Sequence, residues 1–378
     1  MRVGKTPQAI LAARKVLAER TLVVCPAIAV PQWGREWWRW WPQADVAPTI
    51  VSYDRLRLNA KGILTEDYDL AIVDECHFAK NPQAQRTKLI YGKGGVGRRA
   101  RRMWVLSGTP APKHAGELWP MLYAFGVVGL PYDSFVRRYC TVNPFTLKIT
   151  GTKEKTIPEL KALLAKIMLR RTRKEVAPDM PQIAYDFLAV EPRGADYNIP
   201  DGLTDDQLAA WLESHPAVDS DDRQAVAMAK VPALVEEIAS ALNDGLLAQT
   251  VVFGWHVAPL HALAGGLTAH GVRVAVLTGS TPAKDREHIQ LAHRAGLTQV
   301  VVANILAAGT AIDLSNASHG YFLELDWVPG NNAQAANRLV SMDKKEPVTF
   351  DVVTMPGTTD DRVQRVLLTR VAQLSKLY

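Results

Sequence analysis

The stretch from Tyr68 to Asn81, YDLAIVDECHFAKN, constrains the fold most, because a short apolar run ends there in two adjacent carboxylates. A run of this length bounded by polar residues predicts a buried strand. Asp74 and Glu75 then lie at the carboxyl edge of a sheet, where open α/β sheets bind ligands. Phosphoryl transfer needs one carboxylate for Mg²⁺, here Asp74, and a second that orients or deprotonates the attacking water, here Glu75. Taken alone, the stretch has a simpler interpretation as a polar loop after a strand.

A second motif, Gly4-Lys5-Thr6, opens an apolar-periodic helix that is followed by the strand TLVVCP. Backbone N–H groups at a helix start bind phosphates, a lysine there reaches the outer phosphates, and a threonine hydroxyl binds Mg²⁺. The fuller pattern, G-x-x-x-x-G-K-[ST] after a strand, needs more than the three residues that precede Gly4. We therefore expect that a preceding segment or a partner chain completes the loop, or that this chain binds nucleotide weakly.

Length and composition bound the remaining choices. At 378 residues the chain exceeds what one hydrophobic core usually holds, which predicts two domains. Its 44 Lys and Arg against 38 Asp and Glu, a net charge of +6, fit a polyanionic partner without requiring one. Three scattered cysteines with no CxxC pair argue against a zinc or disulfide scaffold and for a reducing compartment. No apolar run has membrane-spanning length, so we expect a cytoplasmic protein, or a nuclear one in a eukaryote, with no membrane partner.

Five of the ten tryptophans lie in one segment, PAIAVPQWGREWWRWWP. Indoles interleaved with arginines can stack on the bases of single-stranded nucleic acid. However, Trp33, Trp37, Trp40 and Trp41 recur at three- and four-residue spacing, which is typical of one buried helix face. We favour core packing and keep base stacking as the alternative.

Short strands alternate with helices in both halves of the chain, which predicts βαβ units on parallel sheets. We therefore expect an α/β fold with two parallel-sheet lobes in tandem. The first lobe would span residues 1–176, including a helical insertion at about 113–167. A linker with a small helical element would follow at 177–245, and the second lobe would span 246–378.

The motifs, taken in order, resemble those of one family. In order along the chain, the segments that are similar to motifs of the Swi/Snf-related DNA translocases of helicase superfamily two are GKTPQAI, PAIAVPQWGREWWRWWP, IVSYDRL, DECHFAKN, LSGTPAPKHAGELWPML, SFVRRYC, MLRRTRKEV, NILAAGTAIDL and DWVPGNNAQAANRLVSMDKK. The resemblance implies two RecA-like lobes, ATP and Mg²⁺ as ligands, and ATP-driven movement along duplex or branched DNA with little sequence preference. The compact length would suit a phage-type member with a truncated N-terminus.

The resemblance also implies roles for individual residues. They fall into catalytic, nucleotide-binding, metal-binding and coupling groups, the last connecting nucleotide state to DNA binding. The catalytic residues are Glu75 and Arg338; the nucleotide-binding residues are Gly4, Lys5, Thr6, Asp74, Gly309, Asp313 and Gln334, of which Thr6 and Asp74 also bind Mg²⁺; and the coupling residues are Ser107, Gly108 and Thr109.

The last motif departs from the family pattern at a position that matters for catalysis. Ser341 stands where the family has a second arginine, the finger that neutralises charge on the transferring phosphoryl group and contributes roughly 10³ to 10⁵ in rate. Lys344 or Lys345 would replace it only with poorer geometry. We therefore expect weak DNA-dependent ATPase activity. The alternative is a DNA-binding module, or one fragment of a split ATPase, with impaired or no turnover.

Overall fold

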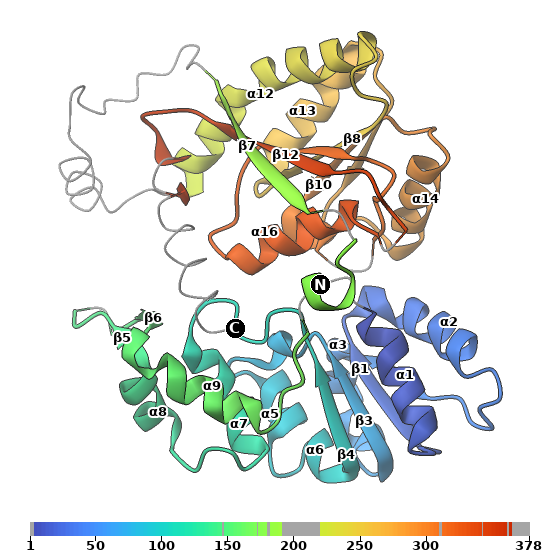
Figure 1. The fold of residues 1–378 in the computed structure, drawn as a ribbon, viewed down its shortest axis with the longest axis vertical. Helices are drawn as coiled ribbons and strands as arrows, with labels where there is room; N and C mark the ends of the chain where they lie inside the picture. The colour runs from blue at the N-terminus through green and yellow to red at the C-terminus, as the bar shows by residue number, and fades with distance from the viewer. Residues whose placement is uncertain are drawn as a thin grey trace. The chain divides into compact units, whose positions relative to one another are not determined.

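The chain folds into two compact units (Figure 1). The first ends at Val176 and the second starts at Ala177. Each is an α/β structure built on its own parallel sheet. The computed structural model describes residues 4–145, 147–171, 173–179, 182–190, 220–309, 312–341, 343–360 and 363–364.

The sheet of the first unit has the strand order β2-β1-β3-β4, and all neighbours run parallel. The central strands are apolar along nearly their whole length, as expected for a parallel sheet with both faces covered. The carboxyl ends of β3 and β4 are in register, with Asp74 opposite Leu106. The strands are β1 (Thr21–Cys25), β2 (Thr49–Ser52), β3 (Tyr68–Asp74) and β4 (Ala100–Leu106).

Helix α2 (Val30–Trp40) buries two of the clustered tryptophans. Trp33 and Trp37 are each 1% exposed, whereas Trp38 is 44% exposed. The core-packing interpretation is therefore confirmed for these two indoles, which lie one helical turn apart. The other helices of this part are α1 (Lys5–Lys15), α3 (Tyr53–Leu58), α4 (Ala60–Ile63), α5 (Gln85–Tyr91) and α6 (Val96–Arg99).

The segment predicted as a helical insertion has a hydrophobic cluster of its own, centred on Leu122, Phe135 and Leu160. It also contains an antiparallel hairpin, β5 (Cys140–Val142) and β6 (Ile149–Thr152), which the sequence did not predict. Strands of three and four residues are too short to give a periodic signal. The helices are α7 (Trp119–Ala124), α8 (Tyr132–Tyr139), α9 (Ile157–Ala165) and α10 (Arg173–Val176).

The sheet of the second unit has the order β7-β12-β11-β8-β10-β9, again with all neighbours parallel. Its largely aliphatic core includes three aromatic rings, those of Phe253, Phe322 and Phe350, which pack at centroid distances of 5.1 to 6.0 Å. The strands are β7 (Ile183–Ala189), β8 (Thr250–Gly254), β9 (Val274–Leu277), β10 (Val300–Asn304), β11 (His319–Phe322) and β12 (Val348–Thr354).

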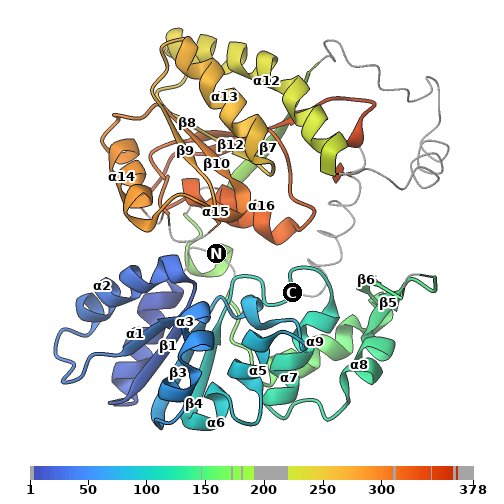
Figure 2. The ribbon, with the colours of Figure 1, turned by 180° about the vertical axis from the view of Figure 1, so that it is seen from behind.

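Residues 177–245, predicted as a linker with a small helical element, differ from that expectation where they are described. β7 pairs with β12 along its whole length, and α12 (Ser220–Asn243) lies against α13 (Val257–Ala269) (Figure 2). β7 is an edge strand whose residues are largely exposed, although its sequence, IAYDFLA, contains only one charged residue, Asp186. Pro232 lies inside α12, where proline ordinarily predicts a helix end. Both elements belong to the second unit.

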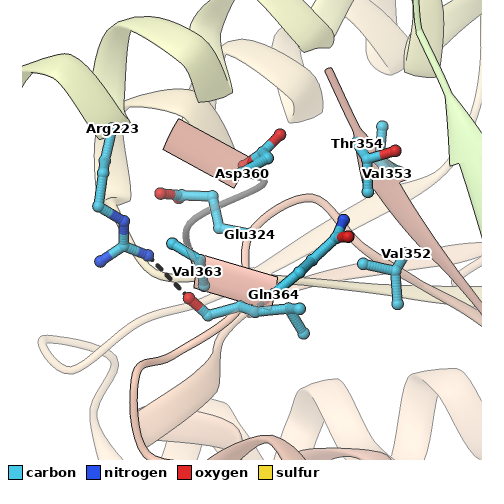
Figure 3. Close-up of a pocket in the computed structure, with 9 residues that line it drawn as sticks. Arg223, Glu324, Val352, Val353, Thr354, Asp360, Val363 and Gln364 are labelled. Atoms are coloured by element: carbon cyan, nitrogen blue, oxygen red, sulfur yellow. Dashed lines mark hydrogen bonds between the residues drawn. The ribbon is translucent and has the colours of Figure 1, made fainter. Parts of the chain in front are cut away.

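A small polar cavity lies where α12 meets the ends of β11 and β12 (Figure 3). Arg223 lines it, donates a 2.7 Å hydrogen bond to the carbonyl of Leu325 and lies 5.1 Å over the Trp327 ring. The cavity volume is about 10 Å³, which is space for one water molecule and excludes a nucleotide. The remaining helices are α14 (Ala283–Arg294), α15 (Ile305–Ala308) and α16 (Pro329–Ala336).

Candidate active site

Strand β3 brings Asp74 and Glu75 to the carboxyl edge of the first sheet. Asp74 ends the strand and is 9% exposed. Glu75 adopts the left-handed conformation, with φ 49° and ψ 54°, and turns the chain into the 3₁₀ helix Cys76–Ala79. This conformation is uncommon outside glycine and costs free energy. Contacts from neighbouring elements must therefore hold the turn.

Tyr53 supplies such a contact. It follows β2 directly, is 4% exposed, and its ring stacks on Phe78 at 5.5 Å. Its hydroxyl lies 2.8 Å from the carbonyl oxygen of Asp74 and 3.3 Å from that of Glu75. Because the hydroxyl donates to these main-chain oxygens, it fixes the turn that presents both carboxylates.

The Asp74 carboxylate has a donor on each oxygen. The indole Nε1–H of Trp33 donates to Oδ2 at 2.9 Å, and the backbone N–H of Glu75 donates to Oδ1 at 2.9 Å. Burial and the neighbouring charge of Glu75 raise the pKa of Asp74 above its ordinary value, against the opposing effects of the Trp33 hydrogen bond and the Lys5 charge. Asp74 is therefore an oriented carboxylate in an environment that favours a bound cation.

Lys5 lies beside the same pair of carboxylates. Its Nζ is 3.7 Å from Oε1 of Glu75. Gly4 precedes it at the start of α1 with φ 74° and ψ 36°, a conformation that glycine adopts without steric cost. Thr6 follows in the first turn and is half-buried. The helix start, where N–H groups lack intrahelical partners, thus adjoins the end of β3.

His77 connects the end of β3 with the end of β4. Its Nδ1 lies 3.2 Å from Oε2 of Glu75 and 3.2 Å from Oγ of Ser107. The backbone N–H of Thr109 donates to the same Ser107 oxygen at 3.0 Å, which closes a turn around Gly108. A rearrangement of this turn would therefore reach Glu75 through a single imidazole.

Three of the four predicted residues of the second unit, Gly309, Gln334 and Arg338, lie close together. The Arg338 guanidinium donates to the carbonyl of Gly309, and a methyl group added to Gly309 would lie 3.5 Å from Oε1 of Gln334. Asp313 lies nearby in sequence, and its N–H donates to Oε1 of Gln290 at 2.9 Å. Arg338 thus holds the loop that carries Gly309.

Near Ser341, the two lysines considered as substitutes differ. Ser341 itself is half-buried. Lys344 donates to the carbonyls of Ser315 and Ala317 at 2.8 and 2.6 Å, and burial lowers the pKa of its ammonium. Lys345 is exposed. Lys344 is therefore occupied by the backbone of its own unit, which leaves Lys345 as the accessible cation.

The sequence assigned none of Trp33, Tyr53 and His77 to the site around Asp74 and Glu75. The place of Tyr53 at the site could have been predicted, because a residue directly after a parallel strand lies at the same sheet edge as Asp74. Trp33 gave no such signal, since the segment after β1 could place any of five indoles there. His77 belongs to the motif DECHFAKN, but the resemblance implied no role for its side chain.

No cluster of three or more His, Cys, Asp and Glu side chains suited to a metal occurs among the described residues. Mg²⁺ does not require one, because it is usually held by one or two carboxylates together with substrate phosphates and water.

In the same described part of the chain, no helix is both long and apolar enough to cross a membrane.

Comparison with known proteins decides the family. The family model described as SNF2-related domain matches residues 43–197, and the one described as Helicase conserved C-terminal domain matches residues 229–342. The chain belongs to the SWI/SNF-related helicase family. Its two parallel-sheet units are the tandem RecA-like lobes of this family, as the sequence predicted. The matched ranges include Asp74, Glu75 and Arg338.

Two relatives of this SWI/SNF-related chain illustrate the similarity. The SWI/SNF-related matrix-associated actin-dependent regulator of chromatin subfamily A-like protein 1 of Xenopus tropicalis is 28% identical, over 100% of this chain and 42% of its own length. The DNA annealing helicase and endonuclease ZRANB3 of Mus musculus is 27% identical, over 99% and 38%. The chain thus spans about two fifths of the length of these relatives. The solved SWI2/SNF2 ATPase core of Sulfolobus solfataricus in complex with double-stranded DNA matches with a TM-score of 0.42 and 19% identity, over 99% of this chain and 86% of that chain.

Proposed function

We propose that this chain is a DNA-dependent ATPase that moves along duplex or branched DNA. The observation that carries the proposal is the arrangement at one sheet edge, where Lys5 and His77 each contact the Glu75 carboxylate beside a buried, oriented Asp74. Membership in the SWI/SNF-related family and similarity to a DNA annealing helicase support DNA as the partner. The net charge of +6 fits binding to phosphates.

The residues present fit a Mg²⁺–ATP ligand. The Thr6 hydroxyl and the Asp74 carboxylate are hard oxygen donors of the kind that Mg²⁺ prefers. Each Asp74 oxygen accepts one hydrogen bond from the protein, which leaves lone pairs for a cation or its water. Lys5 and the start of α1 would hold the outer phosphates. Bound Mg²⁺ would neutralise phosphate charge.

Within this proposal Glu75 accepts the proton of the attacking water. The contacts to Lys5 on one carboxylate oxygen and His77 on the other fix its orientation. His77 also contacts Ser107, so the turn Ser107-Gly108-Thr109 is placed to couple DNA binding to the state of Glu75. Coupling then acts through direct contacts at the strand ends, namely the hydrogen bonds to Ser107 and the close approach of His77 to Glu75, rather than through a distant change in the core.

The second unit supplies the remaining nucleotide contacts in our proposal, through Gly309, Asp313 and Gln334. Arg338 orders the loop carrying Gly309 through its guanidinium and provides positive charge for the γ-phosphate. We take the lobe boundaries to lie near Val176 and Ala177, where the chain divides into its compact units.

A second candidate function is supported by specific observations. A DNA-binding module or split-ATPase fragment with impaired turnover is favoured by Ser341 at the finger position and by the engagement of Lys344 with two backbone carbonyls. In that case ATP hydrolysis would be slow or absent while DNA binding persisted.

Glu75→Gln tests the proposed function. The amide keeps the shape of the side chain and removes the proton acceptor, which in general acid–base catalysis contributes roughly 10² to 10⁴ in rate. We expect DNA-stimulated phosphate release to fall by at least about 10²-fold with unchanged DNA affinity.

Glu66→Gln is the matched control, because Glu66 is an exposed carboxylate paired with Arg20 away from the site. It should leave phosphate release unchanged. Equal rates in Glu75→Gln and the unmodified protein would rule out the assigned base. DNA binding without any turnover in the unmodified protein would establish the second candidate.

A further inference from the structure

We propose that Trp33 is a positioning residue for ATP hydrolysis, because its indole N–H holds the Asp74 carboxylate in the orientation that receives Mg²⁺. The inference rests on the proposed function and concerns a residue to which the family resemblance assigned no part in nucleotide or metal binding. Trp33 lies on α2 and Asp74 at the end of β3, 41 residues apart in sequence. Their contact is therefore made by the tertiary fold and not by the local turn.

The geometry fixes the carboxylate from two sides. Nε1 of Trp33 is 2.9 Å from Oδ2, and the backbone nitrogen of Glu75 is 2.9 Å from Oδ1. The Glu75 donor alone would restrain the carboxylate through one oxygen only. With Trp33, both oxygens are held, and rotation would break a buried hydrogen bond. The Asp74 lone pairs that accept no hydrogen bond from Trp33 or Glu75 therefore point in a fixed direction.

An indole suits this task because it is a rigid, neutral donor. A lysine or arginine at the same place would hold the carboxylate more strongly but would also neutralise it, and would then compete with Mg²⁺. The N–H of Trp33 orients Asp74 and leaves its negative charge for the cation. The ring, 1% exposed, also keeps bulk water away from this side of the carboxylate.

Trp37 provides an internal comparison on the same helix. It is also 1% exposed and packs on Trp41 at a centroid distance of 5.5 Å. Within the described part of the chain its Nε1 has no hydrogen-bond partner. Two indoles of equal burial, one turn apart, therefore differ in hydrogen bonding, because only that of Trp33 donates to Asp74. Core packing accounts for both rings but not for that hydrogen bond.

The experiment compares Trp33→Phe with Trp37→Phe in the full chain. Two quantities are measured: the affinity for ATP with Mg²⁺ and with excess EDTA, and the Mg²⁺ concentration that gives half-maximal DNA-stimulated hydrolysis. We expect Trp33→Phe to weaken the Mg²⁺-dependent part of ATP binding by about tenfold and to raise the half-maximal Mg²⁺ concentration similarly, as befits loss of a hydrogen bond to a charged group. ATP affinity in EDTA should be unchanged. Trp37→Phe should leave the Mg²⁺ dependence within about twofold, the scatter expected of a single neutral replacement.

A second variant carries 3-benzothienylalanine at residue 33, which keeps the bicyclic ring and replaces the N–H with sulfur. It should reproduce the Trp33→Phe result, and it provides the test should the smaller ring destabilise the fold. An unchanged Mg²⁺ dependence in this variant, with an active unmodified protein, overturns the inference and leaves the proposed function standing. Absence of Mg²⁺-dependent ATP binding in the unmodified protein overturns both.

Discussion

Single hydrogen bonds at the strand ends determine how the two carboxylates are presented. Asp74 is held through its side chain by Trp33, and the turn at Glu75 is held through its main chain by Tyr53. Glu75 sits in a left-handed conformation that costs free energy. The presentation of the two carboxylates therefore depends on contacts from α2, to Asp74, and from α3, to the turn at Glu75.

Removing the Tyr53 hydroxyl should affect turnover more than stability. Tyr53→Phe deletes one donor to the carbonyls of Asp74 and Glu75, and we expect the free energy of unfolding to fall by about 1 kcal/mol. Because the turn at Glu75 loses its support, the rate of DNA-stimulated hydrolysis should fall by about tenfold, equivalent to about 1.4 kcal/mol of barrier. Chemical denaturation and steady-state phosphate release measure the two effects.

Tyr68→Phe is the control for this change. Tyr68 begins the same strand at the opposite edge, and its hydroxyl donates to the carbonyl of Ile63 at 3.0 Å. It should cost comparable stability and leave turnover intact. If both variants lower turnover equally, the loss at Tyr53 is a general effect of stability and our account of the turn is wrong.

At the scale of the elements, helix α12 is attached to the rest of its unit through a buried lysine. Its Lys230 is 1% exposed, lies 2.9 Å from Oδ2 of Asp360 and donates to the carbonyl of Val353 at 3.0 Å. The Asp360 carboxylate also accepts the N–H of Met355 at 3.1 Å. A buried amine thus fastens a 24-residue helix to the loop after β12.

Lys230→Met should therefore weaken the second unit. Breaking a buried ion pair by removing one partner costs roughly 3 to 5 kcal/mol, and we expect about 3 kcal/mol because Asp360 is partly exposed. Adding Asp360→Asn removes the orphaned charge and should recover part of the loss. Urea unfolding of the four proteins in this double-mutant cycle gives the coupling energy. Additive losses would mean that the contact stabilises nothing beyond its separate parts.

The elements also indicate where sequence reasoning succeeds and where it fails. Apolar runs such as Leu70–Val73 predict buried parallel strands, because both faces of the strand need apolar cover. From there the sheet edge with Asp74, Glu75 and Ser107 follows, since neighbouring strands end together. β7 is not predicted although IAYDFLA is largely apolar, because the prolines at 178, 181 and 192 around it favour a linker. The contact between Trp33 and Asp74 cannot be predicted from the sequence, because the orientation of an indole depends on tertiary packing, which the spacing of apolar residues does not encode.

For the whole molecule, the residues implied in catalysis divide between the two units. Lys5, Asp74 and Glu75 belong to the first, and Gln334 and Arg338 to the second. Under the proposed function, turnover depends on both sets. Turnover is therefore the quantity that tests the departure at Ser341.

Ser341→Arg should accelerate hydrolysis if this residue occupies the finger position. We expect at least about a tenfold increase in DNA-stimulated phosphate release, a barrier change of about 1.4 kcal/mol. Ser341→Lys supplies the same charge without the planar fork of donors that matches phosphate oxygens, so its gain should be smaller. If instead the unmodified protein already turns over fast and neither change helps, another cation completes the site. Exposed Lys345 is then the residue to change next, because Lys344 is bound to the carbonyls of Ser315 and Ala317.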